Sequence, residues 1–341
     1  MISFYIPLLI RVYISLAFLM AFMLIAPAEG FAGPKNTQGL NCIRKDTTFV
    51  MKKTAVVWSG DKTEAAMYWE YHAPGNKWRV EYIAPTRAKG RVMIQHGTKL
   101  WHWEPSIKTV FITSRGLSLE DSDMIQPLIL KNYLVNEVGP DKVESGRRCR
   151  LLKLIPRNKM DKPSWMLTID RDTGVILKRE RSDSHGNLEM VSQCIEFKPG
   201  AIDPALFQPD RLPKARTICR MMSPRQLSPE HISKLTGIPI PRTLPGGFKL
   251  CSSALVSSNP QTAHITYSDG LAVLSMFTSR ETKPLDRKQG RDVQIGSIQA
   301  LVASCGPYSS ITWSHAKRQY TLVGNVGQGT LINTVNNLIC K

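Results

Sequence analysis

Hydrophobic and polar residues alternate along most of the chain between residues 54 and 197, as expected for β-strands that bury one face. In the run 77–83 this alternation places Trp78, Val80 and Tyr82 on one side of a strand. Turns rich in Gly, Asn and Asp separate the runs, which predicts an antiparallel meander. The expected strands cover residues 77–83, 91–95, 99–103, 109–113, 150–156, 164–170, 174–181 and 188–197.

A polar stretch from residue 118 to residue 136 interrupts these strands. Its apolar residues, Leu134 among them, recur close to helical spacing, and Pro127 can divide the stretch into two shorter helices. The first part of the chain is therefore expected to form one curved sheet with a helical segment laid against it.

Proline marks the next change, because nine prolines fall between residues 199 and 247. This density predicts a linker, within which Ser228 caps a short helix that has Pro229 at its first position. Short strands follow from Phe248 to Val323, and Thr330 is expected to cap a terminal helix. The apolar stripe of that helix consists of Leu331, Val335, Leu338 and Ile339.

The start of the chain is almost entirely apolar from Ile2 to Ile25 and ends in small residues at 26–28. A charge, an apolar run and small residues are typical of a secretory signal peptide, so we expect export and cleavage after Ala28. An uncleaved membrane anchor is the alternative, since the whole run is long enough to span a bilayer. The expected division is a signal peptide at 1–28, a large domain at 29–208, a proline-rich linker at 209–243 and a small domain at 244–341.

The chain is strongly basic, with 45 Lys and Arg against 27 Asp and Glu and a formal net charge of +18. Cleavage would remove one charge, Arg11, and leave +17. An exported protein rarely meets nucleic acid, so we expect no nucleic-acid partner and instead anionic lipids, phosphorylated glycolipids or acidic partner segments. An ordinary solvated basic surface is the alternative.

Seven cysteines in an exported protein predict disulfides. Cys251 with Cys305 is the leading expected pair, because both lie on predicted strands of the small domain, and Cys149 with Cys194 is the second. An odd number leaves at least one cysteine unpaired or paired between chains, so a homo-oligomer is possible. No CxxC occurs, which argues against thioredoxin-type redox chemistry.

No sequence pattern points to catalysis, a metal site or a cofactor. The run GNVGQG at 324–329 lies between a strand and a helix, but its glycines do not follow the dinucleotide-binding order, and we interpret it as a flexible turn. Ser268-Asp269-Gly270 is expected to form a tight turn. The seven histidines lack the paired spacing of a zinc site, so no metal and no enzymatic activity are expected.

Aromatic residues are concentrated on the predicted strands of the large domain. If the curved sheet and a helix close over them, these residues would line an apolar cavity for acyl chains, with basic residues at its rim for phosphorylated headgroups. A filled core is the alternative interpretation. The candidate cavity residues are Trp69, Tyr71, Trp78, Tyr82, Trp101, Trp103 and Trp165.

Several segments resemble the MucB/RseB family of periplasmic sigma-factor regulators. The run HITYSDGLAVLSMF at 264–277 resembles the strand–SDGLA–strand signature of that family's C-terminal domain, and LPGGF at 244–248 resembles its first residues. YTLVGNV at 320–326 resembles its closing strand. In the large domain, WRVEY at 78–82, GRV at 90–92 and IDRDTGVILK at 169–178 resemble the lipoprotein-carrier-like N-terminal domain.

The resemblance implies an α+β fold. It consists of a half-open antiparallel β-barrel with covering helices, like that of lipoprotein carriers, and a smaller α/β sheet domain with a C-terminal helix. The implied function is to bind the periplasmic domain of an anti-sigma factor, shield it from a site-1 protease, and release it when envelope lipid or lipoprotein signals arrive. The alternative is a periplasmic carrier of lipids or lipoproteins, which needs the cavity but not the small domain.

Overall fold

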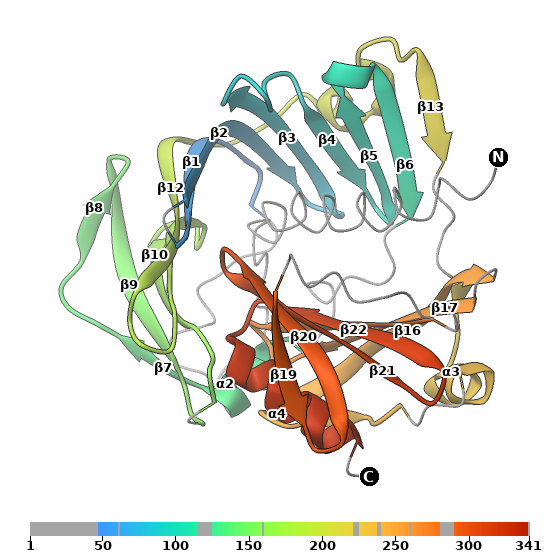
Figure 1. Cartoon of the computed structure of the whole chain (residues 1–341). Helices are drawn as coiled ribbons and strands as arrows, with labels where there is room; N and C mark the ends of the chain where they lie inside the picture. The colour runs from blue at the N-terminus through green and yellow to red at the C-terminus, as the bar shows by residue number, and fades with distance from the viewer. Residues whose placement is uncertain are drawn as a thin grey trace.

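A large sheet of thirteen strands and a smaller sheet of nine strands make up most of the fold (Figure 1). The computed structural model describes residues 47–60, 62–114, 125–158, 160–220, 225–236, 240–258, 261–279 and 290–339. Within these residues neither sheet closes on itself, and helices are few. The molecule is therefore mostly β. The low helix content corrects the expected α+β class to mostly β. The expected α/β small domain is corrected as well, because the nine strands of the smaller sheet pair antiparallel throughout.

The large sheet has the order β13-β6-β5-β4-β3-β2-β1-β12-β11-β10-β9-β7, and β8 also pairs with β9. Its pairs are antiparallel except β13 with β6, which are parallel. The strands are β1 (Phe49–Ser59), β2 (Lys62–Ala73), β3 (Lys77–Ala84), β4 (Val92–His96), β5 (Lys99–Glu104), β6 (Thr109–Ser114), β7 (Tyr133–Glu137), β8 (Lys142–Glu144), β9 (Arg147–Pro156), β10 (Ser164–Asp170), β11 (Ile176–Ser182), β12 (Leu188–Pro199) and β13 (Thr217–Arg220).

Alternating burial confirms the predicted strand pattern in the large sheet. Along β3, Trp78, Val80 and Tyr82 are all buried and contribute to one hydrophobic cluster. The eight predicted strands coincide with β3–β6 and β9–β12 within a few residues at their ends, and β9 begins earlier, at Arg147. A period of two residues therefore identified both the strands and the shared face.

The predicted helical stretch is shorter in the structure than its apolar spacing indicated. Helix α2 covers Ile125–Asn132, with Pro127 in its first turn, where the missing N–H is tolerated. Residues 118–124 lie outside the described residues. Leu134, expected on the apolar side of this helix, is instead 41% exposed on β7. The chain pairs with β9 from Tyr133 onward, so tertiary strand pairing overrides the local helical pattern.

The small sheet has the order β14-β16-β17-β18-β22-β21-β20-β19, and β15 also pairs with β16. The strands are β14 (Arg225–Gln226), β15 (Thr243–Leu244), β16 (Phe248–Ser258), β17 (Gln261–Ser268), β18 (Val273–Ser279), β19 (Arg291–Ile295), β20 (Ile298–Cys305), β21 (Tyr308–His315) and β22 (Arg318–Gly324).

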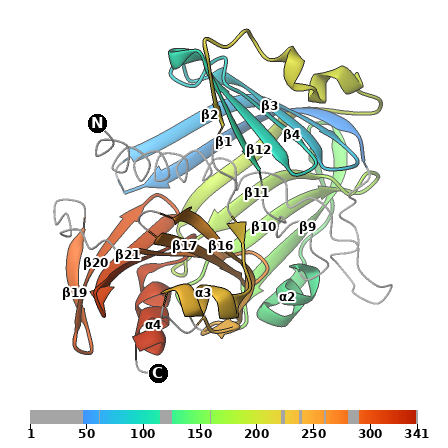
Figure 2. The ribbon, with the colours of Figure 1, turned by 90° about the vertical axis from the view of Figure 1, so that its right-hand side faces the viewer.

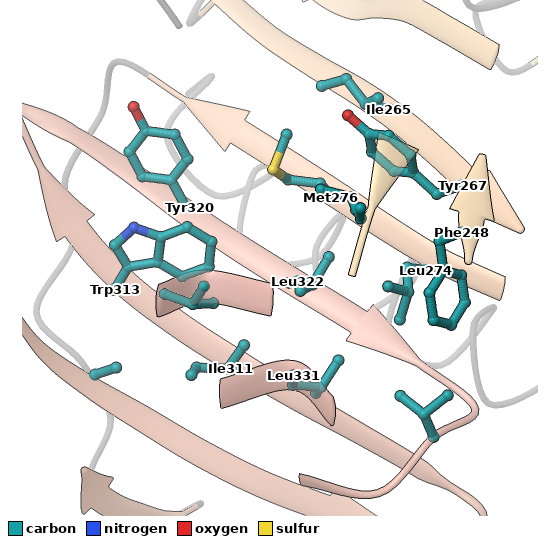
Figure 3. Close-up of a cluster of buried hydrophobic side chains, with 14 of the residues drawn as sticks. Phe248, Ile265, Tyr267, Leu274, Met276, Ile311, Trp313, Tyr320, Leu322 and Leu331 are labelled. Carbon is teal, nitrogen blue, oxygen red and sulfur yellow. The ribbon is translucent and has the colours of Figure 1, made fainter. Parts of the chain in front are cut away.

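One face of the small sheet is the core of this domain (Figure 3). Phe248 and Tyr267 are fully buried there, and the rings of Trp313 and Tyr320 stack with centroids 5.0 Å apart. Helix α4 (Gln328–Ile339) buries Leu331 against the same face, as its apolar stripe predicted. Full burial of such side chains stabilises the fold by about 1.5–3 kcal/mol each.

Short helices occupy the proline-rich segment. The 3₁₀ helices η3 (Pro204–Phe207) and η4 (Pro209–Arg211) precede β13, and helix α3 (Pro229–Thr236) follows β14. The predicted cap of α3 is confirmed, because the hydroxyl of Ser228 accepts a hydrogen bond from the amide of His231 at 3.2 Å. The predicted cap of α4 is wrong, because Thr330 lies inside that helix and its hydroxyl donates to the carbonyl of Asp161 at 2.9 Å.

The large sheet curves over the small sheet, as two perpendicular views show (Figures 1 and 2). The segment with η3 and η4 lies on the outer side of the arch, whereas α2 lies on its inner side. The expected signal peptide at 1–28 lies outside the described residues. None of the helices in the described part of the chain has the length and apolar character needed to cross a bilayer.

Candidate ligand-binding face

The pairing of residues on neighbouring strands places one set of side chains of the large sheet on a single continuous face. Tyr68 of β2 lies opposite Tyr82 of β3, and on the far side of β12 the same face continues from Met190 through Arg181 to Trp165. This face looks toward the small domain, because at its β9–β11 end it carries α2 and contacts Leu271 of the small domain. We call it the concave face. Its largest hydrophobic cluster contains Ala55, Ala66, Tyr68, Trp78, Val80, Tyr82, Ala88, Met93, Leu100 and Met190, with Val57 and Trp165 packed against it.

The concave face brings together three of the seven predicted cavity residues. Trp78, Tyr82 and Trp165 all belong to or pack against its main cluster. Trp165 also contacts the neighbouring cluster beneath α2, so it links the two halves of the face.

The other four predicted cavity residues point to the opposite, convex face. One row of paired residues crosses the sheet from β2 to β5. In this row Trp69 pairs with Glu81, Glu81 with Val92, and Val92 with Trp103, so all four side chains lie on the same face. Tyr71 and Trp101 share this side by the same alternation. The seven aromatic residues therefore do not form one layer. Equal spacing within separate strands could not reveal this, because the relation between strands depends on turn lengths and bulges.

Residues of the proline-rich segment cover part of the convex face. Leu212 and Ala215 pack against a buried cluster that includes Trp103, which is 6% exposed. The guanidinium of Arg79 donates to the carbonyl of Leu206 at 2.8 Å and ties η3 to β3. Around Trp103 the filled-core interpretation therefore applies.

The concave face also contains buried polar groups. The ammonium of Lys53 and a carboxylate oxygen of Glu70 are 2.9 Å apart, and the two side chains are 3% and 1% exposed. Neither ring nitrogen of His102 has a hydrogen-bond partner, and neither do the indole nitrogens of Trp78 and Trp165. Burial lowers the pKa of His102 to about 4, against the opposing effect of nearby Glu104. The imidazole is therefore neutral at neutral pH.

Part of the predicted basic surface is neutralised by ion pairs. Arg147 donates two hydrogen bonds of 3.0 Å to the buried carboxylate of Asp170 and one of 2.8 Å to Asp172. Burial alone would raise the pKa of Asp170, but the bonds from Arg147 and Thr173 outweigh it and hold that pKa below its usual value. Arg147 of β9 therefore holds the turn that contains Asp170 and Asp172 rather than presenting a free charge.

No metal site is found in the described residues, where no group of three or more His, Cys, Asp or Glu could hold an ion. His72 lies within 2.8 Å of the carbonyl of Thr47 through Nδ1, and its ring packs against Phe49. His102 is buried elsewhere, on β5.

No disulfide bond joins the cysteines whose side chains are described, which are Cys149, Cys194, Cys219 and Cys251. Cys149 and Cys194 are buried in the same hydrophobic cluster, where burial raises the pKa of each thiol to about 11. Their pairing stays a prediction. The side chain of Cys305 lies outside the described residues, so its pairing with Cys251 also stays a prediction.

A second polar cluster lies where the large sheet and the small sheet meet, and no local sequence pattern indicates it. Asp269, predicted as a turn residue, does form that turn by accepting the amides of Leu271 and Ala272 through Oδ1. Its other oxygen, Oδ2, accepts the phenolic hydrogen of Tyr133 at 3.0 Å, and Asn132 donates to its carbonyl at 2.8 Å. The partners are more than 130 positions apart in the sequence, which explains why spacing could not identify them.

Comparison with known proteins gives one family and several similar structures. Residues 48–214 match the model of the MucB/RseB N-terminal domain. A crystal structure of MucB in complex with MucA(peri) is 19% identical and covers 84% of this chain and 91% of that chain, with a TM-score of 0.53. The complex structure of Pseudomonas aeruginosa MucA/MucB gives the same identity and coverages and a TM-score of 0.55. Among curated proteins, no sequence matches the chain.

Proposed function

Since the chain belongs to the MucB/RseB family through its large domain, we propose that it is a periplasmic regulatory protein that binds the periplasmic part of an anti-sigma factor. The observation that carries this proposal is the likeness to MucB in two complexes with MucA, which extends over 84% of the chain and so includes both sheets. Regulators of this family are binding proteins rather than enzymes, and the prediction of a non-catalytic chain is confirmed at that level.

The partner is expected to be acidic where it contacts this protein. The net charge of +18 favours association with a negatively charged segment and suppresses association with basic ones. We further propose that both domains contribute to the interface, that residues 1–28 are a cleaved export signal, and that the division at 209–243 separates the two domains.

A pull-down with the mature chain 29–341 tests this function. The bait, immobilised at physiological salt, should retain the purified periplasmic segment of a single-span anti-sigma factor from the same cell. A scrambled segment of the same net charge is the matched control, because it retains electrostatic attraction but not the specific surface. Equal retention of both segments, or retention of neither by a folded bait, would count against the proposal.

A second function, lipid sensing, is supported by the concave face. Trp78 and Tyr82 are each 7% exposed in an apolar cluster with Trp165, and the buried indole N–H groups of Trp78 and Trp165 lack partners. This composition suits an amphiphile with an acyl chain and polar atoms, for which these side chains would have to part. If the protein is a regulator, binding of such a lipid releases the anti-sigma factor. If it is a carrier, it transports the lipid.

Matched tryptophan variants test the lipid proposal. Trp165→Ala on the concave face should weaken binding of a fluorescent acyl probe about tenfold or more, because it removes a large aromatic contact. Trp101→Ala, on the convex face of the same sheet, should leave that affinity unchanged. Equal effects of the two variants would contradict a site on the concave face. Probe transfer between vesicles by the unmodified protein would favour the carrier.

A further inference from the structure

Two adjacent residues of opposite charge reach from the large domain into different loops of the small domain. Asp161 and Lys162 lie just before β10, in the connection that follows β9. The carboxylate of Asp161 accepts the amide of Gly329 at 3.2 Å, and its backbone carbonyl accepts the amide of Gly327 at 2.9 Å. A residue 168 positions away therefore supplies the cap at the N-terminus of α4.

Lys162 makes the second contact. Its ammonium lies 2.6 Å from Oδ2 of Asp269, and both side chains are fully buried. It also donates to the carbonyl of Gly246 and lies 4.7 Å from the ring centroid of Phe248. All three partners belong to the small domain, so the charge is neutralised only when the two domains are in contact.

Two glycines of the small domain leave the space that these contacts need, because glycine has no Cβ atom. A Cβ atom on Gly327 would lie 1.9 Å from the carboxylate of Asp161, and one on Gly247 would lie 1.9 Å from the amide oxygen of Asn132. The run GNVGQG, which resembles a phosphate-binding turn, is thus filled by a carboxylate of the same chain. This gives its glycines a role that a flexible turn does not explain.

The contacts are continuous with the concave face. Trp165 follows Lys162 by three residues and packs against the cluster that contains Tyr133, whose hydroxyl donates to Asp269. Arg181, also on this face, donates to the carbonyl of Asn325 at 2.9 Å.

We propose that Asp161 and Lys162 form a two-pronged clasp that fixes the small domain against the large domain, and that opening this clasp separates the binding surface shared by the two domains. Each prong reaches a different loop, so together they restrain rotation as well as separation. The clasp itself is independent of the proposed function, whereas its effect on partner affinity rests on that function.

Two variants of the mature chain open the clasp in different ways. The double variant Lys162→Met/Asp269→Asn removes both charges without leaving one buried, and the side-chain oxygen of Asn can still accept the turn amides. Asp161→Ala removes the carboxylate that accepts the amide of Gly329 and leaves the bond from the amide of Gly327 to the backbone carbonyl of residue 161 in place. Glu230→Gln is the matched control, because it breaks an exposed ion pair of 2.8 Å with Arg242 that lies within the proline-rich segment and away from the clasp.

Hydrogen exchange and small-angle X-ray scattering report the result. Asp161→Ala should exchange the amide of Gly329 about tenfold faster than wild type, as expected for the loss of a hydrogen bond to a charged group. The double variant should also speed exchange at residues 327–331, because separation of the two sheets draws these amides away from residue 161. Both clasp variants should also show a larger radius of gyration with unchanged circular dichroism, whereas the control should match wild type. If the double variant unfolds, Asp161→Ala still decides the matter.

If both clasp variants show the amide exchange rates and the radius of gyration of wild type, the proposal that Asp161 and Lys162 fix the small domain is wrong. The binding arm is read separately: the clasp variants should bind the anti-sigma segment about tenfold more weakly than wild type. Open variants with undiminished affinity would overturn the link to binding but not the clasp. A wild-type protein without affinity would overturn the proposed function and leave the first two measurements valid.

Discussion

The buried pair of Lys53 and Glu70 gives the sharpest stability prediction for the concave face. Lys53→Met removes the cation and leaves a carboxylate that is 1% exposed, with one oxygen that already lacks a hydrogen-bond partner. Breaking a buried pair in this way costs about 3–5 kcal/mol, because the remaining charge is desolvated without compensation. For a domain of this size that corresponds to a fall in Tm of about 6–20 °C.

Removing the second charge as well should restore stability. Lys53→Met/Glu70→Leu should unfold within about 1–2 kcal/mol of wild type, because apolar side chains replace a pair that contributes little net stability. Urea unfolding followed by tryptophan fluorescence measures both values. Arg87→Met is the matched control, since it breaks an exposed pair between the turn after β3 and Glu64 of β2 that is worth less than about 1 kcal/mol. A single variant Lys53→Met as stable as this control would refute the burial of the pair.

Three further predictions follow from burial. The pKa of His102 in the folded protein, about 4, lies below its value in the unfolded chain, so the unfolded chain binds more protons. The free energy of unfolding should therefore fall by roughly 3 kcal/mol as pH drops from 6.5 to 4. His102→Leu should flatten this part of a curve of stability against pH, and an unchanged slope would argue against the burial of His102. Leu331→Ala should cost about 2–5 kcal/mol in urea unfolding, because the side chain is fully buried under the small sheet, and a cost under 1 kcal/mol would mean that α4 is not packed there. Maleimide should label the exposed Cys219 in the folded protein but label Cys149 and Cys194 only after unfolding; if those two resist labelling until a reductant is added, they are paired.

Much of the fold could be predicted because its local signals agree with its packing. Alternation over 77–83 gave both the strand and the shared side of Trp78 and Tyr82, and the serine–proline pair at 228–229 gave the start of α3. The helix expected to run to residue 136 ended earlier, since pairing of β7 with β9 is a long-range interaction that helical spacing does not encode.

The candidate sites were predicted less well for a related reason. Equal spacing could not tell that Trp101 and Trp78 point to opposite sides of one sheet, because that depends on the register across β3, β4 and β5. The contact of Lys162 with Asp269 spans 107 positions, and the local pattern around Asp269 predicts its turn but not its partner. Site geometry thus depended on tertiary contacts that one sequence does not display.

Calorimetric titration of the mature chain with the periplasmic segment of its anti-sigma factor tests the central claim most directly. We expect saturable one-to-one binding with a Kd of about 1 μM or tighter, near −8 kcal/mol, that weakens as salt rises. Two folded partners that release no heat and form no complex at about 100 μM would contradict it.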